Sequence, residues 1–258
     1  MLELVVCTLS TENSPGMIRM TQKTLNHLEV CNYKLRGVHI GNPKSSLSVR
    51  MKHLYGDNLI IENEPSTKNH FKRARLMSEI AMTSLKENFR CAIIDNPSAI
   101  VYTEGDKHTF VPSIPLIARP IISHNADLTM AVRSDNGFNK FPLVQMAIEG
   151  FVNWNFSKIT GIKTDYEYGP RAFSPDVAQL FCDYPRNDWG IFNYPVICAM
   201  LEGKRYEGVV VDGSPQPDYM SKYPAMMTFP LAHLAWRAIQ NIPILKAGKL
   251  AQELYAKR

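Results

Sequence analysis

Residues 99–108 have the sequence Ala-Ile-Val-Tyr-Thr-Glu-Gly-Asp-Lys-His, an apolar run of strand length that leads directly into two carboxylates, Glu104 and Asp106. In an extended chain, side chains two residues apart point to the same side, so these two carboxylates can converge on one ion. Ligands bind beyond the carboxyl ends of the strands in open α/β sheets. The stretch therefore predicts a buried strand that ends in a binding site.

Strand and helix patterns alternate along the first half of the chain. Apolar runs of strand length cover residues 2–8, 34–40, 58–62, 90–95, 98–103 and 126–133. Apolar residues at helical spacing follow Pro15, and a long helix is expected from about Thr67 to Glu87. This order predicts an α/β fold in which helices flank a Rossmann-related, mostly parallel central sheet with right-handed crossovers.

The second half of the chain is more helical. Shorter helices are expected over residues 175–181 and 192–201, a strand over 206–211, and two closing helices over about 230–240 and 245–256. The periodicity of residues 141–159 predicts an amphipathic helix whose inward residues are Leu143, Ala147, Ile148, Phe151 and Val152. No linker is long enough to separate independent domains, so we expect one domain over residues 1–258 with a helical C-terminal third.

Composition excludes several classes of protein. The 258 residues are 45% hydrophobic and 21% charged, which is typical of a globular chain. No apolar stretch approaches the about 20 residues of a transmembrane helix, and the N-terminus lacks a basic signal region, so we expect a cytoplasmic protein. The five cysteines show no CxxC spacing, which argues against a zinc ribbon or a disulfide scaffold. Basic residues are not interleaved with aromatic ones, so no nucleic-acid partner is expected.

The carboxylate pair after residue 103 has two interpretations. Carboxylate oxygens suit Mg²⁺ or Mn²⁺, which would in turn bind a substrate diphosphate, and His108 would shift the preference toward Mn²⁺. On this interpretation Asp106 lies in a solvent-facing cleft. Alternatively, Glu-Gly-Asp is a polar turn that leaves the strand and directs His108 to solvent. The residues alone leave both interpretations open.

Two later segments add to the pattern. They are Ala126-Asp-Leu-Thr-Met-Ala-Val-Arg133 and Asp165-Tyr-Glu-Tyr-Gly-Pro-Arg171-Ala-Phe173. The order and approximate spacing of these segments and the acidic pair resemble family 2 glycosyltransferases of the GT-A fold. Within that family, the sequence is similar to dolichyl-phosphate mannose synthases and related polyprenyl-phosphate sugar transferases. The resemblance covers about residues 1–215 and implies a GT-A-like fold.

The resemblance also implies roles for individual residues. It places a Mn²⁺ or Mg²⁺ ion on Glu104, Asp106 and His108, and an acceptor or donor phosphate on Arg171. Residues 38–43 lack the carboxylates that the family uses near the nucleobase, and Asp95 is expected to replace them in part. The residues expected to bind the donor are Thr8, Ser10, Glu12, Asp95 and Arg133.

The activity that the resemblance implies is an inverting transfer of a sugar from a GDP- or UDP-linked donor. The acceptor would be a glycan or small-molecule hydroxyl, or a polyprenyl phosphate. A hydroxyl acceptor needs a general base, for which Asp165, Glu167 and Asp188 are the candidates. Residues 1–135 would form the nucleotide-sugar-binding half and 136–258 the acceptor side. Assembly into a homo-oligomer and peripheral contact with the inner membrane face, through the basic C-terminal helix, stay open.

Two other functions are compatible with parts of the sequence. A nucleotidyltransferase would share the sheet and the metal site, but residues 9–17 are not the glycine-rich basic loop with which that class opens. A degenerate GT-A domain could instead serve as a non-catalytic binding or assembly subunit. The lack of a carboxylate in residues 38–43 favours this second alternative.

Overall fold

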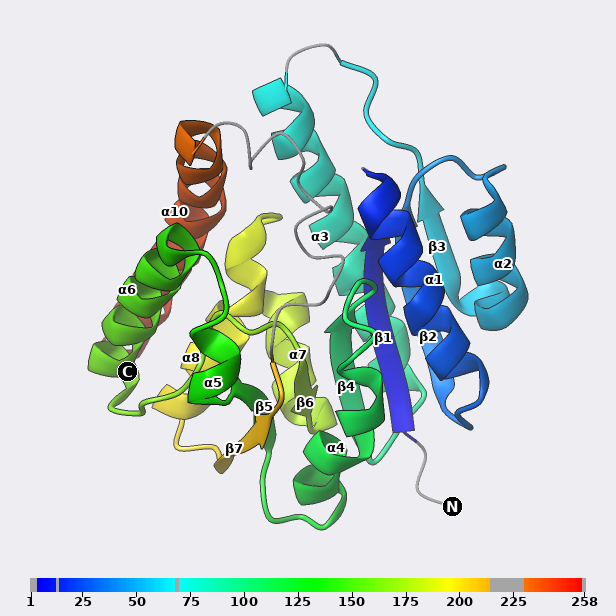
Figure 1. Cartoon of the computed structure of the whole chain (residues 1–258). Coiled ribbons are helices and arrows are strands. Elements are labelled where there is room, and N and C mark those ends of the chain that lie inside the picture. The colour runs from blue at the N-terminus through cyan, green and yellow to red at the C-terminus, as the bar shows by residue number, and fades with distance from the viewer. Residues whose placement is uncertain (1–3, 13, 68–69, 214–229, 257–258) are drawn as a thin grey trace.

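The chain forms a seven-stranded sheet with the strand order β3-β2-β1-β4-β6-β5-β7 (Figure 1). The computed structural model describes residues 4–12, 14–67, 70–213 and 230–256. The strands are β1 (Leu4–Thr11), β2 (Lys34–Ile40), β3 (Leu59–Glu62), β4 (Ala99–Glu104), β5 (Leu128–Arg133), β6 (Arg171–Phe173) and β7 (Tyr206–Val211). Every neighbouring pair is parallel except the two that β6 forms with β4 and β5. The expected mostly parallel sheet is confirmed.

Helices cover both faces of this sheet. One face carries α1 (Pro15–Glu29), α2 (Ser46–Tyr55) and α4 (Ile114–Ile122), and the other carries α3 (His70–Ile94), α7 (Pro175–Asp183) and α8 (Tyr194–Leu201). The alternation of strand side chains feeds both cores, since Cys7 of β1 packs on the α3 side and Val6 on the α1 side. The described helices thus form one layer on each face of the sheet (Figure 1).

The C-terminal third extends the α3 side of the molecule. Helices α6 (Leu143–Thr160) and α10 (Pro230–Tyr255) contact each other and α8, and lie side by side at one end of the molecule (Figure 1). The expectation of two closing helices is wrong, because α10 continues through Pro243 as one helix. No helix in the described ranges is both long enough and apolar enough to cross a membrane.

The expected inward face of α6 is also wrong. Val152 is buried, but Leu143, Ala147 and Phe151 point to solvent and Ile148 is half-buried. The reason is that the inward side of α6 meets a buried arginine of β5, and it therefore carries polar residues. These inward residues include Gln145 and Glu149.

Candidate functional site

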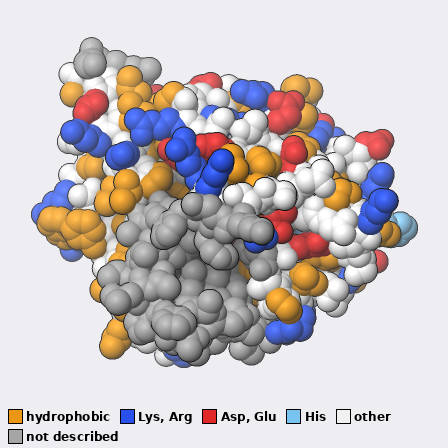
Figure 2. All heavy atoms as spheres, turned by 90° about the horizontal axis from the view of Figure 1, so that it is seen from above, with side chains coloured by type: hydrophobic (Ala, Val, Ile, Leu, Met, Phe, Trp, Pro, Cys, Tyr) orange, Lys and Arg blue, Asp and Glu red, His pale blue; other side chains and the backbone are white. Residues whose placement is uncertain are grey.

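The carboxyl ends of β1 and β4 meet at one edge of the sheet. Gly105 donates its backbone N–H to the carbonyl oxygen of Leu9 at 2.7 Å, which continues the pairing of the two strands past Glu104. A Cβ on Gly105 would lie 2.6 Å from Cβ of Ser10, so only glycine allows this approach. Figure 2 looks down onto the molecule from this side and shows acidic and basic side chains next to one another.

Neither side chain of the acidic pair is exposed to solvent, since Glu104 is half-buried and Asp106 is buried. Asp106 is only 3% exposed, so the expected solvent-facing position is wrong. Oε2 of Glu104 is buried and has no hydrogen-bond partner among the described residues. The ring of His108 stacks on that of His27, with 6.5 Å between the centroids.

These residues fit a cation in part. In the described ranges, no group of three or more His, Cys, Asp and Glu side chains is arranged to hold a metal ion. Glu104 and Asp106 nevertheless provide oxygen ligands of the kind that Mg²⁺ and Mn²⁺ prefer, and such ions commonly complete their coordination with substrate phosphates and water. Two carboxylates therefore fit the ion, and the assignment of His108 stays a prediction.

Arg171 lies beside the acidic pair but below the surface. Arg171 pairs with Tyr102 across β4 and β6, so the segment 165–173 meets the sheet next to the acidic pair. The side chain is 1% exposed, and its Nη2 donates to the carbonyl oxygen of Tyr166 and to Oδ1 of Asn193. Burial lowers the pKa of Arg171, and the negative charges of Glu167 and Glu104 oppose that shift. Arg171 is thus a buried charge within the electrostatic range of Glu104.

Arg133, at the end of β5, is held by two carboxylates. Its Nε and Nη2 donate to Oδ2 and Oδ1 of Asp165 at 2.6 and 2.8 Å, and its Nη1 lies 2.8 Å from Oε2 of Glu149. Burial alone would lower the pKa of Arg133. The hydrogen bond to Asp165 and the charge of Glu149 outweigh burial, so the pKa lies above its usual range. The guanidinium also lies over the rings of Phe138, Phe141 and Tyr168.

Tyr168 connects this arginine to the loop that carries the acidic pair. Its ring lies 5.3 Å from the guanidinium carbon of Arg133 and 5.5 Å from Nζ of Lys107. Burial raises the pKa of Tyr168 to about 12, so the phenol is neutral at physiological pH. The loop after β4, the segment before β6 and the end of β5 therefore form one contiguous site.

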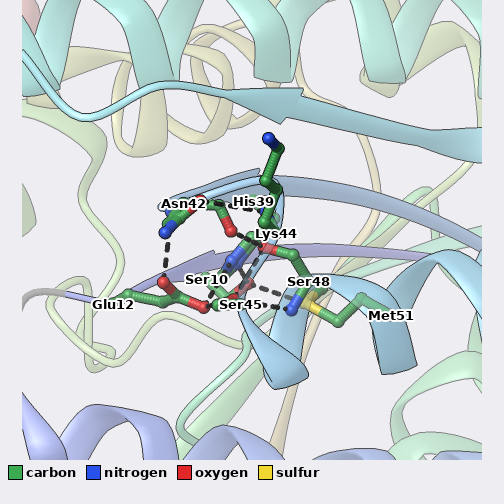
Figure 3. A network of polar contacts seen from close by, with 8 residues as sticks. All are labelled: Ser10, Glu12, His39, Asn42, Lys44, Ser45, Ser48 and Met51. Atoms are coloured by element: carbon green, nitrogen blue, oxygen red, sulfur yellow. Dashed lines mark hydrogen bonds and ion pairs between the residues drawn. The ribbon is translucent and has the colours of Figure 1, made fainter.

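A second polar network lies at the same edge of the sheet, at the ends of β1 and β2 (Figure 3). The buried His39 ring lies 2.9 Å from Oγ of Ser10 through Nδ1 and 3.3 Å from Oε1 of Glu12 through Nε2. Glu12 also accepts hydrogen bonds from the backbone N–H of Asn42, at 3.1 Å, and from Oγ of Ser45. Burial lowers the pKa of His39, and the carboxylate of Glu12 opposes that shift. Glu12 thus brings to the end of β2 the carboxylate that residues 38–43 lack.

Three of the residues expected at the site lie elsewhere. Thr8 is buried and its hydroxyl is 2.8 Å from that of Tyr55. Asp95 precedes β4 at the opposite edge of the sheet, where it forms ion pairs with Lys34 and Arg36, and these hold its pKa below the usual value. Asp188 caps the short helix η3 (Trp189–Phe192) by accepting hydrogen bonds from Tyr184 and Gly190.

Sequence reasoning missed Glu149, Tyr168, Gly169 and His39 as members of the site. Glu149 lies in a helix that was expected to turn apolar residues inward, and His39 is a single histidine in a strand. Tyr168 and Gly169 stand within the segment 165–173, whose position beside β4 follows from an antiparallel pairing that local patterns do not reveal. The acidic residue just after a buried strand, Glu12, was the one local indication of the second network.

Comparison with known proteins gives likenesses of structure alone. No protein-family model matches the sequence, and no curated protein matches it. The structure is similar to glucosyl-3-phosphoglycerate synthase from Mycobacterium tuberculosis in complex with UDP, at 12% identity and a TM-score of 0.49, over 92% of this chain and 80% of that one. It is also similar to a mannosyltransferase from Pyrobaculum calidifontis in complex with GDP-mannose and Mn²⁺, at 14% identity and a TM-score of 0.44, over 99% and 73%. Likenesses at this level assign neither a substrate nor a residue to the present chain.

Proposed function

We propose that this chain is a metal-dependent glycosyltransferase that moves a sugar, with inversion, from a GDP- or UDP-linked donor to an acceptor. One observation carries the proposal: Glu104 and Asp106 end a central strand at the carboxyl edge, and Oε2 of Glu104 is buried without a hydrogen-bond partner among the described residues. A buried carboxylate oxygen in that position costs free energy until a donor or a cation approaches it. A divalent ion carried by a nucleotide diphosphate meets this requirement.

Each part of the site has a role in this proposal. Glu104 and Asp106 would hold Mg²⁺ or Mn²⁺, which neutralises charge on a departing diphosphate when it is bound. Arg133 is held in place by Asp165 and Glu149. It would position the ring of Tyr168, which also contacts Lys107 in the loop of the acidic pair. The network of Ser10, His39 and Glu12 bounds the nucleoside end of the site.

The acceptor decides whether a base is needed. Asp165 is buried against Arg133, and Asp188 caps η3. Glu167 is half-buried and accepts a hydrogen bond from Nδ2 of Asn193 at 3.3 Å, within the electrostatic range of Arg171. Glu167 is therefore the candidate to take the proton of an acceptor hydroxyl. A polyprenyl phosphate is already anionic and would need no base.

A thermal-shift titration tests the donor class. GDP, UDP and their sugars are added with and without Mn²⁺, and a ligand at about 100 times its Kd should stabilise the fold by about 2.7 kcal/mol. A shift that requires the ion supports the proposal. No shift with any of these nucleotides would contradict it.

The second candidate is a non-catalytic domain that binds a nucleotide sugar. The observation that favours it is the lack of a three-residue metal group in the described ranges. Incubation with UDP- or GDP-sugars, followed by chromatographic detection of the free nucleotide diphosphate, separates the two. Binding of the nucleotide sugar without any release of the diphosphate, with water or with added acceptors and with or without Mn²⁺, would assign the chain to this second class.

A further inference from the structure

Helix α6 carries apolar residues on both of its sides. Its inward side buries Gln145 and Glu149, which serve the Arg133 network, and then Val152 and Phe156, which belong to the hydrophobic core. The opposite side carries Leu143, Ala147, Phe151 and Trp154, at a spacing of four, four and three residues. We call these four residues the outer face of α6. A helix normally turns its apolar residues to the core, so their exposure needs a separate explanation.

The outer face is substantially open to solvent. Leu143 is 79% exposed, Phe151 53% and Trp154 56%. The rings of Phe151 and Trp154 contact each other, with their centroids 6.0 Å apart. At the rise of an α-helix, the face extends for about 16 Å along the axis. Single exposed apolar residues such as Val30 are ordinary, whereas exposed apolar residues that share one side of a helix, with two aromatic rings in contact, indicate an interaction surface.

The exposed charged residues within and next to α6, over residues 139–163, are all lysines. Within residues 139–163, the exposed charged residues are Lys140, Lys158 and Lys163, and Glu149, which is the one acidic residue in that range, is buried against Arg133. Lysines therefore stand at both ends of the stripe. The neighbouring helix α10 adds lysines at 246 and 249, the second of which pairs with Glu253.

We propose that the outer face of α6 docks onto an anionic membrane surface. Trp and Phe side chains that lie between lysines are the composition of helices that bind in the plane of an anionic bilayer. The aromatic rings would enter the boundary between headgroups and acyl chains, and the lysines would meet the lipid phosphates. The proposal needs no helix that crosses the membrane and does not rest on the transferase activity.

A second copy of the chain fits this face less well. A two-fold dimer that packs α6 against its copy in antiparallel fashion would bring Lys158 of one protomer near Lys140 of the other. Like charges would then face each other at both ends of the contact, which opposes association. An anionic membrane surface instead carries charge opposite to that of the lysines at both ends of the outer face.

Sedimentation of the full chain with lipid vesicles tests the proposal. We expect binding to vesicles that contain phosphatidylglycerol and little binding to vesicles of phosphatidylcholine alone, with binding weakened by about 0.5 M salt because the lysine contribution is screened. Phe151→Ser/Trp154→Ser should weaken binding by about tenfold or more, since two aromatic side chains no longer enter the boundary. The control Val30→Ser/Leu116→Ser, which removes exposed apolar side chains from other parts of the surface, should bind like the wild type.

Two further kinds of variant separate charge from apolar contact. Lys140→Gln, Lys158→Gln and Lys163→Gln should each weaken binding to anionic vesicles by about fivefold. Trp154→Phe keeps an apolar ring at this position, so it should retain binding. It should lose most of the quenching of tryptophan emission that brominated lipids cause in the wild type.

Defined outcomes would overturn the proposal. They are a wild-type chain that ignores anionic vesicles, and a Phe151→Ser/Trp154→Ser variant that folds and binds them undiminished. A dimer in analytical ultracentrifugation that this variant dissociates, without vesicle binding, would assign the face to a second copy instead.

Discussion

The carboxylate of Glu104 occupies the space where a side chain of residue 169 would stand. A Cβ on Gly169 would lie 2.1 Å from Oε1 and 2.3 Å from Oε2 of Glu104. The strand register explains this closeness, because Tyr102 pairs with Arg171 and both Glu104 and Gly169 lie two residues beyond that pair. The position of one member of the acidic pair therefore depends on a glycine that is distant in sequence.

Replacement of that glycine should disturb the acidic pair. We expect Gly169→Ala to displace Glu104 or β6, to lower the free energy of unfolding by about 1–3 kcal/mol, and to weaken Mn²⁺-dependent nucleotide binding. Denaturant unfolding and calorimetric titration measure the two effects. Gly150→Ala in α6 is the control, since its Cβ would meet no atom within 4 Å and alanine favours the helix. Nucleotide binding by Gly169→Ala at wild-type affinity would contradict this account of the site.

Removal of one negative charge should abolish the proposed ion site. Because Asp106 is buried, the suitable change is Asp106→Asn, which retains the side-chain volume. We expect the Mn²⁺-dependent stabilisation of about 2.7 kcal/mol by the nucleotide diphosphate to disappear, while circular dichroism stays unchanged. Asp57→Asn, at an exposed position in the turn after α2, is the control. If Asp106→Asn leaves metal-dependent binding intact, the assignment of Asp106 fails.

The arginine of β5 should be a major contributor to stability. Arg133→Met would leave the buried carboxylates of Asp165 and Glu149 without their partner, so we expect the free energy of unfolding to fall by about 3–5 kcal/mol. Arg205→Met removes an exposed partner of Asp127 and should change stability little. Urea unfolding of both variants measures the difference. Equal effects of the two changes would show that the buried network does not hold α6 against the sheet.

His39 should make the stability depend on pH. Burial places its folded pKa below the unfolded value of about 6.5, so the unfolded chain binds more protons in the interval between the two values. The contribution of His39 is therefore complete above about pH 6.5, and it is lost as the pH falls from there toward the folded pKa. Unfolding by urea at about pH 7.5 and about pH 5.5 should show a smaller loss of stability for His39→Gln than for the wild type. His53→Gln, on the exposed side of α2, should behave like the wild type, and an unchanged pH dependence in His39→Gln would contradict the prediction.

Local patterns located six of the seven strands and the place of the acidic pair, but they missed β6, and the apolar run expected over residues 90–95 belongs to the end of α3. The apolar runs before Glu104 and within β1 match the strands observed, because a buried strand must present apolar residues on both faces. The runs within β2 and β7 match as well, although β7 at the edge of the sheet is largely exposed. The pair itself follows a central strand, and the carboxyl ends of parallel strands meet at one edge. These features depend on residues that are near in sequence.

The sequence by itself thus determined the alternation of strands and helices and the position of Glu104 and Asp106 at a strand end. The tertiary structure alone decided that Gly169 makes room for Glu104, that Glu12 reaches the end of β2, and that Asp95 lies at the opposite edge. It also decided that α6 turns Glu149 inward and Trp154 outward, against its expected orientation. The physical reason is that a buried arginine requires charged partners, and the residues that supply them are brought to Arg133 by the packing of distant elements.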